Sequence, residues 1–320
     1  MVFCNAYDYA GLMKPSAKPP AASPTDWLMI VVLSIIWGGS FLFGRILMLE
    51  WPPFTVVFLR VALAAIALWV FVLLTARRFP KDLNLIGAIL VMGIINNVIP
   101  FSLILIGQQE IGSGLASVVN AMTPIWTLII ANALTTDEKF SANKIFGILF
   151  GFAGVTILIG SDLLEGLSAS AWAQVAVLGA TISYGFAGVF GKRFGGHDPI
   201  LISTGQLTAS SLVMIPLVLM IEEPFSLTPA TGEMIVSIFG LSILCTAIAY
   251  VLFFKILSNA GATNVSLVTF LVPVSAILLG LIWLGEVLTL SNLMGMALIL
   301  IGLALVDGRV LRKLTANRDS

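Results

Sequence analysis

Ten apolar stretches, each about as long as a membrane-spanning helix, constrain the fold of this chain more than any other feature. Each stretch could cross a hydrocarbon layer of about 30 Å at about 1.5 Å per residue. The charged fraction is only 10% and the mean hydropathy is +1.07, whereas soluble domains carry roughly a quarter charged residues. Alternating segments, which a membrane β-barrel needs, do not occur. We therefore predict an all-α integral membrane protein with ten transmembrane helices, at residues 27–48, 53–74, 83–107, 112–134, 143–160, 170–191, 198–221, 232–257, 260–284 and 291–311.

The segments between these stretches are short and polar, so no separate soluble domain fits between them. Residues 1–26 are polar and rich in proline, and we predict that they form a disordered cytoplasmic tail. They lack the apolar core of a secretory signal, so we expect no cleaved targeting peptide. Residues 161–169 are expected to form an external linker, and residues 312–320 a second cytoplasmic tail.

The distribution of Lys and Arg predicts how the chain is oriented. Of the 16 cations, Arg45 and Arg60 lie within apolar stretches, and the other 14 (16 minus 2) all lie on one side when links alternate. The positive-inside rule assigns that side to the cytoplasm. We therefore predict a multi-pass protein of a bacterial-type inner (plasma) membrane, with both termini cytoplasmic.

The two halves of the chain repeat one pattern. The segment WGGSFLFGRI at 37–46 is matched by YGFAGVFGKR at 184–193, and similar Gly, Pro and Glu matches follow at offsets of 147 to 149 residues. Such a constant offset indicates gene duplication. Because each copy has five spans, an odd number, the second copy enters from the opposite side of the membrane. We predict two inverted-topology repeats, 27–160 and 170–311, an architecture typical of transporters that bind their substrate where the halves meet.

These residues give the chain a family resemblance. It resembles the drug/metabolite transporter superfamily in its ten-helix form with two EamA-type domains, through Trp37-Gly38, Arg45, Pro52, Arg60, GLASVVNAMTP at 114–124, Glu138, Gly147, Gly151, Gly154, Pro273, Gly285-Glu286, Gly295 and Gly302. The resemblance implies efflux of small organic solutes. Within the superfamily the chain is similar to bacterial exporters of amino acids and metabolites, including the aromatic amino-acid exporter group. The second half departs from the first at Arg60, whose counterpart region holds Gln206 and Leu207.

Polar and aromatic side chains share helical faces in corresponding spans of the two halves. Asn97 and Phe101 lie four residues apart, and Thr246 and Tyr250 are their counterparts in the second repeat. Polar groups in a membrane favour partners or a wet cavity. We predict a central substrate cavity lined by Asn97, Phe101, Asn120, Thr246, Tyr250, Thr269, Phe270, Trp37 and Tyr184. The alternative is that the polar groups are hydrogen-bonding contacts between helices.

Prolines and an arginine inside the spans have two interpretations each. Pro124 and Pro273 are repeat mates that remove helix hydrogen bonds, so they are predicted as paired hinges or, alternatively, as static kinks. Arg60 is a candidate contact for a substrate carboxylate or phosphate, although such an arginine also ties helix ends or extends toward the interface. Glu138 and Glu286 precede spans and are expected to stabilise helix termini rather than to gate.

Other functional classes find little support in the sequence. No nucleophile and base pair, metal-ligand cluster or cofactor motif is present, so we predict neither an enzyme nor a cofactor or metal site. No basic patch indicates nucleic acid, and no obligatory protein partner is evident; the expected partners are a small-molecule substrate and the lipid bilayer. A nucleotide-sugar or sugar-phosphate exchanger is the alternative within the superfamily, and a channel-like or structural membrane protein is the alternative outside it. No Asp or Glu lies near the centre of a span, so the energy coupling stays open.

Overall fold

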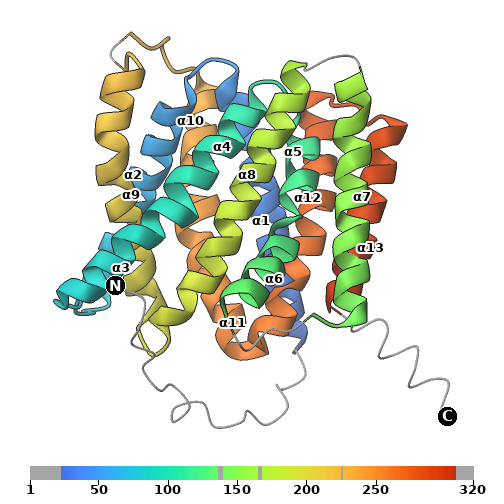
Figure 1. The fold of residues 1–320 in the computed structure, drawn as a ribbon. Coiled ribbons are helices and arrows are strands. Elements are labelled where there is room, and N and C mark those ends of the chain that lie inside the picture. The colour runs from blue at the N-terminus through green and yellow to red at the C-terminus, as the bar shows by residue number, and fades with distance from the viewer. Residues whose placement is uncertain (1–22, 136–139, 165–167, 225, 308–320) are drawn as a thin grey trace.

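The computed structural model describes residues 23–135, 140–164, 168–224 and 226–307, and every regular element within them is a helix (Figure 1). Ten helical segments in these ranges are long and apolar enough to cross a membrane, which confirms the predicted fold class. Residues 1–22 of the first predicted tail, the whole second tail at 312–320, residues 165–167 of the external linker, and Glu138 lie outside the described residues.

We number the membrane spans 1 to 10 along the chain. The first repeat contains α1 (Pro24–Met48), α2 (Pro53–Leu74), α3, η2 and α4 (Leu83–Gly93, Ile94–Val98, Ile99–Gln108), α5 and α6 (Ser113–Asn120, Thr123–Leu134) and α7 (Ala142–Leu164) as spans 1 to 5. The second repeat contains α8 and η3 (Ala169–Phe190, Gly191–Phe194), α9 (Pro199–Ile221), α10, η4 and α11 (Gly232–Phe239, Gly240–Ile248, Ala249–Val265), α12 (Leu267–Leu284) and α13 (Leu290–Asp307) as spans 6 to 10.

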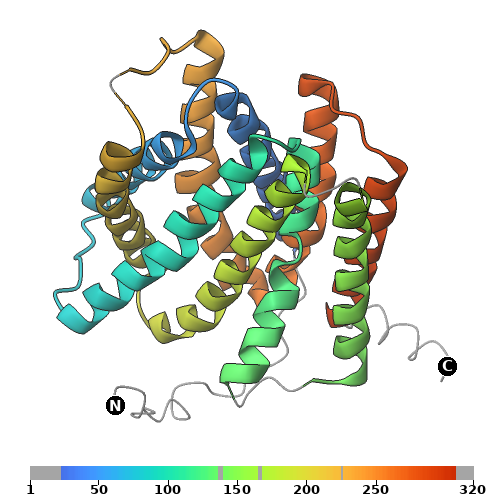
Figure 2. The same cartoon turned by 45° about the horizontal axis from the view of Figure 1, so that its top comes forward.

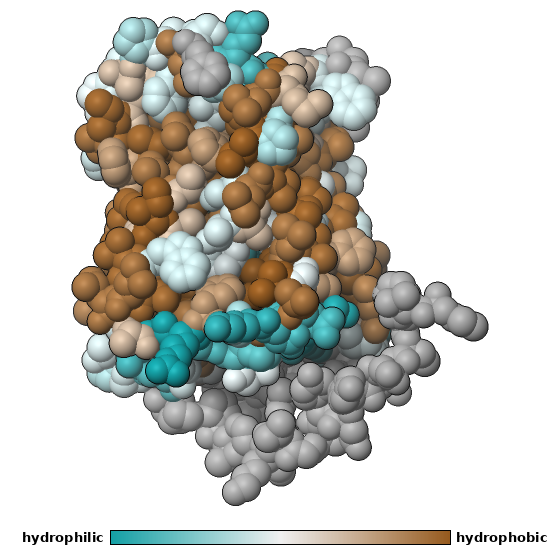
Figure 3. All heavy atoms as spheres, turned by 90° about the vertical axis from the view of Figure 1, so that its left-hand side faces the viewer, coloured by the Kyte–Doolittle hydropathy of each residue, from teal (hydrophilic) through white to brown (hydrophobic). Residues whose placement is uncertain are grey.

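The helices stand side by side and present an apolar belt to the outside. Figure 3 shows this belt on one face of the molecule, with more hydrophilic residues above and below it. Ile66 and Val70 of α2 and Leu212 and Leu219 of α9 are exposed on the surface of the bundle. In a soluble protein such large exposed apolar areas would favour aggregation, but in a bilayer they contact lipid.

The helices interlock across the two repeats rather than forming two separate bundles. Span 1 packs against spans 8 and 9, and its mate, span 6, packs against spans 3 and 4. Span 2 packs along its own mate, span 7, and span 5 packs along span 10; α7 and α13 lie side by side in Figures 1 and 2. Every one of these pairings maps onto another or onto itself when the repeats are exchanged, as an in-plane two-fold axis requires.

Glycines at mated positions bring these helices close together. A side chain at Gly38 would meet the backbone nitrogen of Ala276 at 2.8 Å, and one at its mate Gly185 would meet that of Thr127 at 3.1 Å. Ala276 and Thr127 are themselves 149 residues apart. The matching geometry of these two contacts indicates that glycines of the repeated WGGSFLFGRI segment allow close helix approach.

Two spans contain matching π-helical turns. η2 interrupts span 3 and η4 interrupts span 8, at corresponding places in the repeats. A π-helical turn rotates the residues that follow it relative to an unbroken α-helix, and such turns are frequent at functional sites. Span 4 is also interrupted, at Ala121 and Met122, directly before Pro124, whereas span 9 continues through Pro273 as one helix.

Candidate functional site

A cavity of about 740 Å³ lies inside the bundle. Its lining residues come from spans 1 to 4 and 6 to 9, so both repeats contribute, whereas spans 5 and 10 contribute none. The volume is in the range of small-molecule sites. Spans 5 and 10 instead pack on each other at the side of the bundle, where Gly147 approaches Gly302 and Gly154 approaches Gly295.

The cavity reaches one face of the molecule. Its lining includes Phe194, Gly195, Gly196 and His197 of the link between α8 and α9, of which the last three are exposed. None of the links at the opposite face contributes a lining residue among those described. The cavity therefore opens toward the face that carries the 191–199 link, and we refer to this opening as the mouth.

Arg60 lies in the cavity wall and is only 7% exposed. Its Nε donates a hydrogen bond of 3.0 Å to Oγ1 of Thr246 from the other repeat. Its guanidinium carbon lies 3.6 Å from the centre of the Phe101 ring. Among the described residues, the hydrogen bond to Thr246 is the one bond that this guanidinium makes to the protein.

A hydrogen-bonded network of amides continues the wall beyond Arg60. The Tyr250 hydroxyl donates to Oδ1 of Asn97 at 2.9 Å, and Nδ2 of Asn97 donates to the Ser210 hydroxyl at 3.0 Å. Nδ2 of the neighbouring Asn96 lies 3.3 Å from Oε1 of Gln206. The network joins spans 3, 7 and 8, and it therefore couples the two repeats at the depth of the π-helical turns.

The cavity wall also contains a pair of packed aromatic rings and, separately, the amide of Asn120. Trp37 and Phe253 pack with ring centroids 5.6 Å apart. Asn120, at the end of α5, has a buried Oδ1 without a hydrogen-bond partner. Buried acceptors without partners are rare in proteins, because the desolvated oxygen costs free energy. Asn120 thus offers a free acceptor to a ligand in the cavity.

The structure brings most of the predicted site residues to this one cavity. Eight of them line it: Trp37, Arg60, Phe101, Asn120, Tyr184, Tyr250, Thr269 and Pro273. Asn97 and Thr246 are fully buried behind the wall, where they bind the side chains of Tyr250 and Arg60. Phe270 and Pro124 are not among the lining residues.

Sequence reasoning missed Asn96 and Gln206, which line the cavity. Asn97, and not Asn96, shares an α-helical face with Phe101 in the sequence. The π-helical turn at Ile94–Val98 alters that register, and nothing in the local sequence announces it. Gln206 stands out in the sequence only as part of the counterpart region of Arg60.

At the face opposite the mouth, Glu286 ties spans 4 and 9 together. Its carboxylate accepts hydrogen bonds from the backbone N–H groups of Ser113 and Gly114 and from the Ser113 hydroxyl. It fits because Gly112 and Gly280 carry no side chains that would fill its place. An anion at the start of α5 also interacts favourably with the helix dipole. The predicted role at a helix terminus is therefore observed, but the helix belongs to the other repeat.

Three more contacts lie at this face. Glu222, at the end of α9, accepts from the backbone N–H groups of Phe54 and Thr55 at 2.8 and 2.7 Å. The Trp51 indole donates to the carbonyl of Thr228 at 3.2 Å. Arg45 donates to the carbonyls of Gln108 and Gln109. The segment that contains Arg45 and Trp51 is the repeat mate of the 191–199 link, so mated segments are closed at one face and open at the other.

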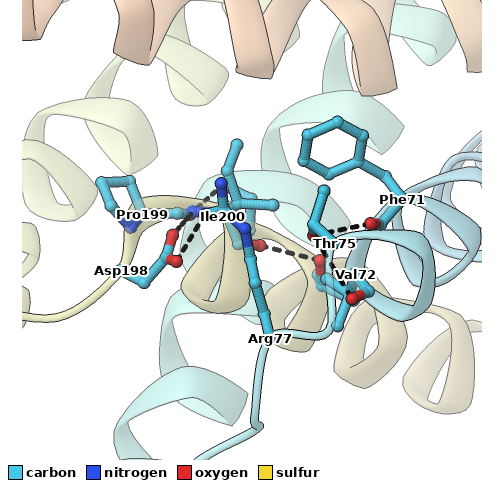
Figure 4. Close-up of polar contacts among 9 residues, drawn as sticks. Phe71, Val72, Thr75, Arg77, Asp198, Pro199 and Ile200 are labelled. Carbon is cyan, nitrogen blue, oxygen red and sulfur yellow. Dashed lines mark hydrogen bonds and ion pairs between the residues drawn. The ribbon is translucent and has the colours of Figure 1, made fainter.

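The mouth face has a different set of contacts. Arg77, after α2, forms an ion pair with Asp198, whose other carboxylate oxygen accepts from the backbone N–H of Ile200 at 2.9 Å (Figure 4). Asp198 thereby caps α9 and links it to α2. No cluster of three His, Cys, Asp or Glu side chains that could hold a metal ion occurs within the described residues.

Comparison with known proteins is consistent with this geometry. The sequence model of the EamA-like transporter family matches residues 26–160 and again residues 171–307. Uncharacterized transporters with similar sequences occur in Archaeoglobus fulgidus (27% identity, 88% of this chain and 98% of the relative) and Bacillus subtilis (YoaV, 24%, 86% and 94%). The uncharacterized inner membrane transporter YedA of Escherichia coli K12 is 28% identical over 87% of this chain and 89% of its own length.

A solved crystal structure shares the fold, with a TM-score of 0.65 at 18% identity, over 91% of this chain and 99% of the other.

Proposed function

The chain belongs to the EamA-like transporter family, and from this premise we propose that it exports small organic solutes, chiefly neutral amino acids, including aromatic ones, and related metabolites or drugs. Transport proceeds by alternating access around the central cavity. The observation that carries the proposal is one cavity, lined by both repeats and open at one face only.

The chemistry of the wall supports an amphipathic solute. Trp37, Tyr184 and Phe253 offer aromatic surface, while Asn96 and Asn120 offer amide groups. An aromatic or aliphatic side chain packs on the first set, and an amino group donates to the unpaired oxygen of Asn120. Among the described residues, Arg60 is the one Lys or Arg that lines the cavity. This disfavours the nucleotide-sugar and sugar-phosphate alternative, because multiply charged phosphates are bound by several cations.

The inverted repeat supports alternation between two conformations, each open at one face of the protein. In the present state the 191–199 link is open. Its mate, around Arg45 and Trp51, is closed by contacts with the end of span 3 and with the link between α9 and α10. Exchange of the conformations of the two repeats would close the mouth and open the opposite face. Pro124 and Pro273 are proposed as hinges in this exchange, with the break at Ala121 and Met122 as the flexible point.

The direction of export rests on the cation count. We assign the mouth to the cytoplasmic side, together with Arg77, Lys192 and both termini, by the positive-inside rule. The present state would then accept solute from the cytoplasm of a cell bounded by a bacterial-type inner membrane.

Counterflow in reconstituted vesicles tests this proposal. Vesicles loaded with an unlabelled amino acid should accumulate the labelled one transiently, and the rate should saturate with concentration. Asn120→Leu, which removes the free acceptor and makes this part of the wall apolar, should abolish exchange. Non-saturable flux would indicate a channel, and exchange of nucleotide sugars alone would overturn the proposed substrates.

A further inference from the structure

We propose that Arg60 binds an acidic group of the transported solute, so that the cavity selects compounds that carry one carboxylate. This inference rests on the proposed transport function and names the charge that its substrates must have. It concerns the interior of the cavity and assigns Arg60 as a specificity-determining residue.

The buried charge of Arg60 is costly for the protein. Arg60 is the eighth residue of α2, which places it about 10 Å into the span at about 1.5 Å per residue, and it is 7% exposed. A buried charge within a membrane span is expensive unless it has a partner or faces water. In the described part of the chain, no Asp or Glu lies among the cavity-lining residues. The protein therefore does not neutralise this charge within the cavity.

The guanidinium of Arg60 has unused hydrogen-bond donors. An arginine side chain has five N–H donors, and among the described residues Arg60 uses only Nε, toward Thr246. Phe101 covers one face of the planar group and offers a cation–π contact. These two contacts fix the position and plane of the group. The two terminal nitrogens stay available at the cavity wall.

The free side of this guanidinium matches a carboxylate ligand. Two parallel N–H donors of an arginine bind the two oxygens of one carboxylate in a bidentate pair. A single guanidinium balances the single negative charge of one carboxylate group, whereas a phosphate dianion would leave an uncompensated negative charge beside Arg60. A permanently cationic solute would face Arg60 without any carboxylate in the lining, and we expect it to be excluded.

A purely structural role for Arg60 would be expected to use more of its donors on the protein. The hydrogen bond to Thr246 joins the two repeats, but a neutral amide could make that bond without burying a charge. The counterpart region of the second repeat in fact carries Gln206 and Leu207. A bound acidic ligand therefore best explains why this position carries a positive charge.

Binding of matched probes to the purified protein in nanodiscs tests the inference. The probes are indole-3-acetate, indole-3-acetamide and tryptamine, which differ in charge at constant shape, with isovalerate and isovaleramide as an aliphatic pair. We expect the carboxylates to bind at least about tenfold more tightly than the amides, as one charge-assisted bidentate contact provides. Tryptamine should not bind. Benzoate and phenyl phosphate, compared directly, distinguish a carboxylate site from a phosphate site; tighter binding of the phosphate would contradict the inference.

Variants assign the preference to one residue. Arg60→Gln should remove the carboxylate preference, and Arg60→Lys should keep part of it. Arg78→Gln is the matched control, since Arg78 is exposed in the link after α2 and does not line the cavity; it should leave the preference intact. The inference is wrong if no carboxylate binds the wild-type protein, or if the preference survives in Arg60→Gln.

Flux measurements separate this result from the fate of the proposed function. If vesicles carry no amino acid but the carboxylate preference depends on Arg60, the proposed substrates are wrong and the site stands. If amino acids and their amides are transported equally and Arg60→Gln changes neither rate, the proposed function stands and the role of Arg60 is wrong.

Discussion

At the scale of single residues, Arg60 illustrates a conflict between stability and binding. Its charge is buried and has one protein hydrogen bond among the described residues. Replacing a buried charge by an apolar side chain of similar size is often neutral or stabilising, because the desolvation cost disappears. Sites kept for function are commonly places where stability has not been optimised.

We therefore predict that Arg60→Met leaves the unfolding midpoint unchanged or raises it, while transport falls by at least about tenfold. Thermal unfolding in nanodiscs and vesicle counterflow on the same preparations would measure both. A large fall in the midpoint would instead indicate that the hydrogen bond to Thr246 is the main role of Arg60.

Two threonines provide a matched test of the cavity wall. Thr127 lines the cavity and donates to the carbonyl of Thr123 at 2.9 Å. Thr156 is exposed on α7 and donates to the carbonyl of Phe152, also at 2.9 Å. Valine has nearly the same shape as threonine, so each substitution only replaces a hydroxyl by a methyl group.

We predict that Thr127→Val raises the apparent KM by about fivefold, which corresponds to about 1 kcal/mol for one lost hydrogen bond to the solute. Thr156→Val should have the transport kinetics of the wild type. Equal kinetics of all three proteins in counterflow would show that the Thr127 hydroxyl does not contact the solute.

At the scale of helices, spans 5 and 10 depend on glycine for their contact. A side chain at Gly154 would meet the carbonyl oxygen of Gly295 at 2.6 Å, so both helix backbones would have to move apart. Gly87 of α3 is the matched control, since nothing lies within 4 Å of a side chain built there.

We predict that Gly154→Val destabilises the protein by at least about 1 to 3 kcal/mol, as overpacking does, and that Gly87→Val does not. The comparison of thermal unfolding midpoints in one lipid composition would measure this. Equal midpoints would mean that the two helices do not pack closely in the membrane.

Glu286 couples two helices that both line the cavity. It bonds to the start of α5 from the end of α12 and thereby closes the face opposite the mouth. A neutral glutamine can accept fewer and weaker hydrogen bonds from these N–H groups, because charge-assisted bonds are the stronger ones.

We predict that Glu286→Gln shifts the population toward the state that is open at that face. The distance between spin labels at the ends of spans 4 and 9 that lie opposite the mouth should become longer or more broadly distributed. Glu233→Gln is the control, since Glu233 is exposed on α10 at the same face and should change nothing. An unchanged distribution for Glu286→Gln would exclude it from the closure.

At the scale of the whole molecule, the inverted repeat and the mouth together make a prediction about orientation. His197 lies at the mouth, and Ala230 is exposed in the link between α9 and α10 at the opposite face. The chain has two cysteines, Cys4 and Cys245, so a background without them permits labelling of single introduced cysteines.

We predict that a membrane-impermeant thiol reagent labels Ala230→Cys in intact cells and His197→Cys only in inverted vesicles. The reason is the excess of Lys and Arg at the mouth face, which favours the cytoplasm. The reverse labelling pattern would place the mouth on the outer side of the membrane. The present state would then accept solute from outside the cell, as an importer does.

The sequence by itself determined the ten spans, their inverted duplication and the family. These features depend on hydrophobic length, on a constant offset between repeated residues and on the odd number of spans per copy, all of which are local or countable properties. Symmetric stripes of polar and aromatic residues also predicted that Phe101, Asn120 and Tyr250 lie together, and all three line the one cavity.

Only the tertiary structure decided which of two adjacent amides reaches the cavity, where the cavity opens and what Arg60 and Glu286 contact. Asn96 replaced Asn97 at the wall because a π-helical turn changes the helical register, and that turn depends on packing. Arg60 meets Thr246, 186 residues away, and Glu286 meets Ser113, 173 residues away. Helical periodicity describes the faces of one helix, but the contacts between distant helices arise from how the two repeats interlock, which no single span encodes.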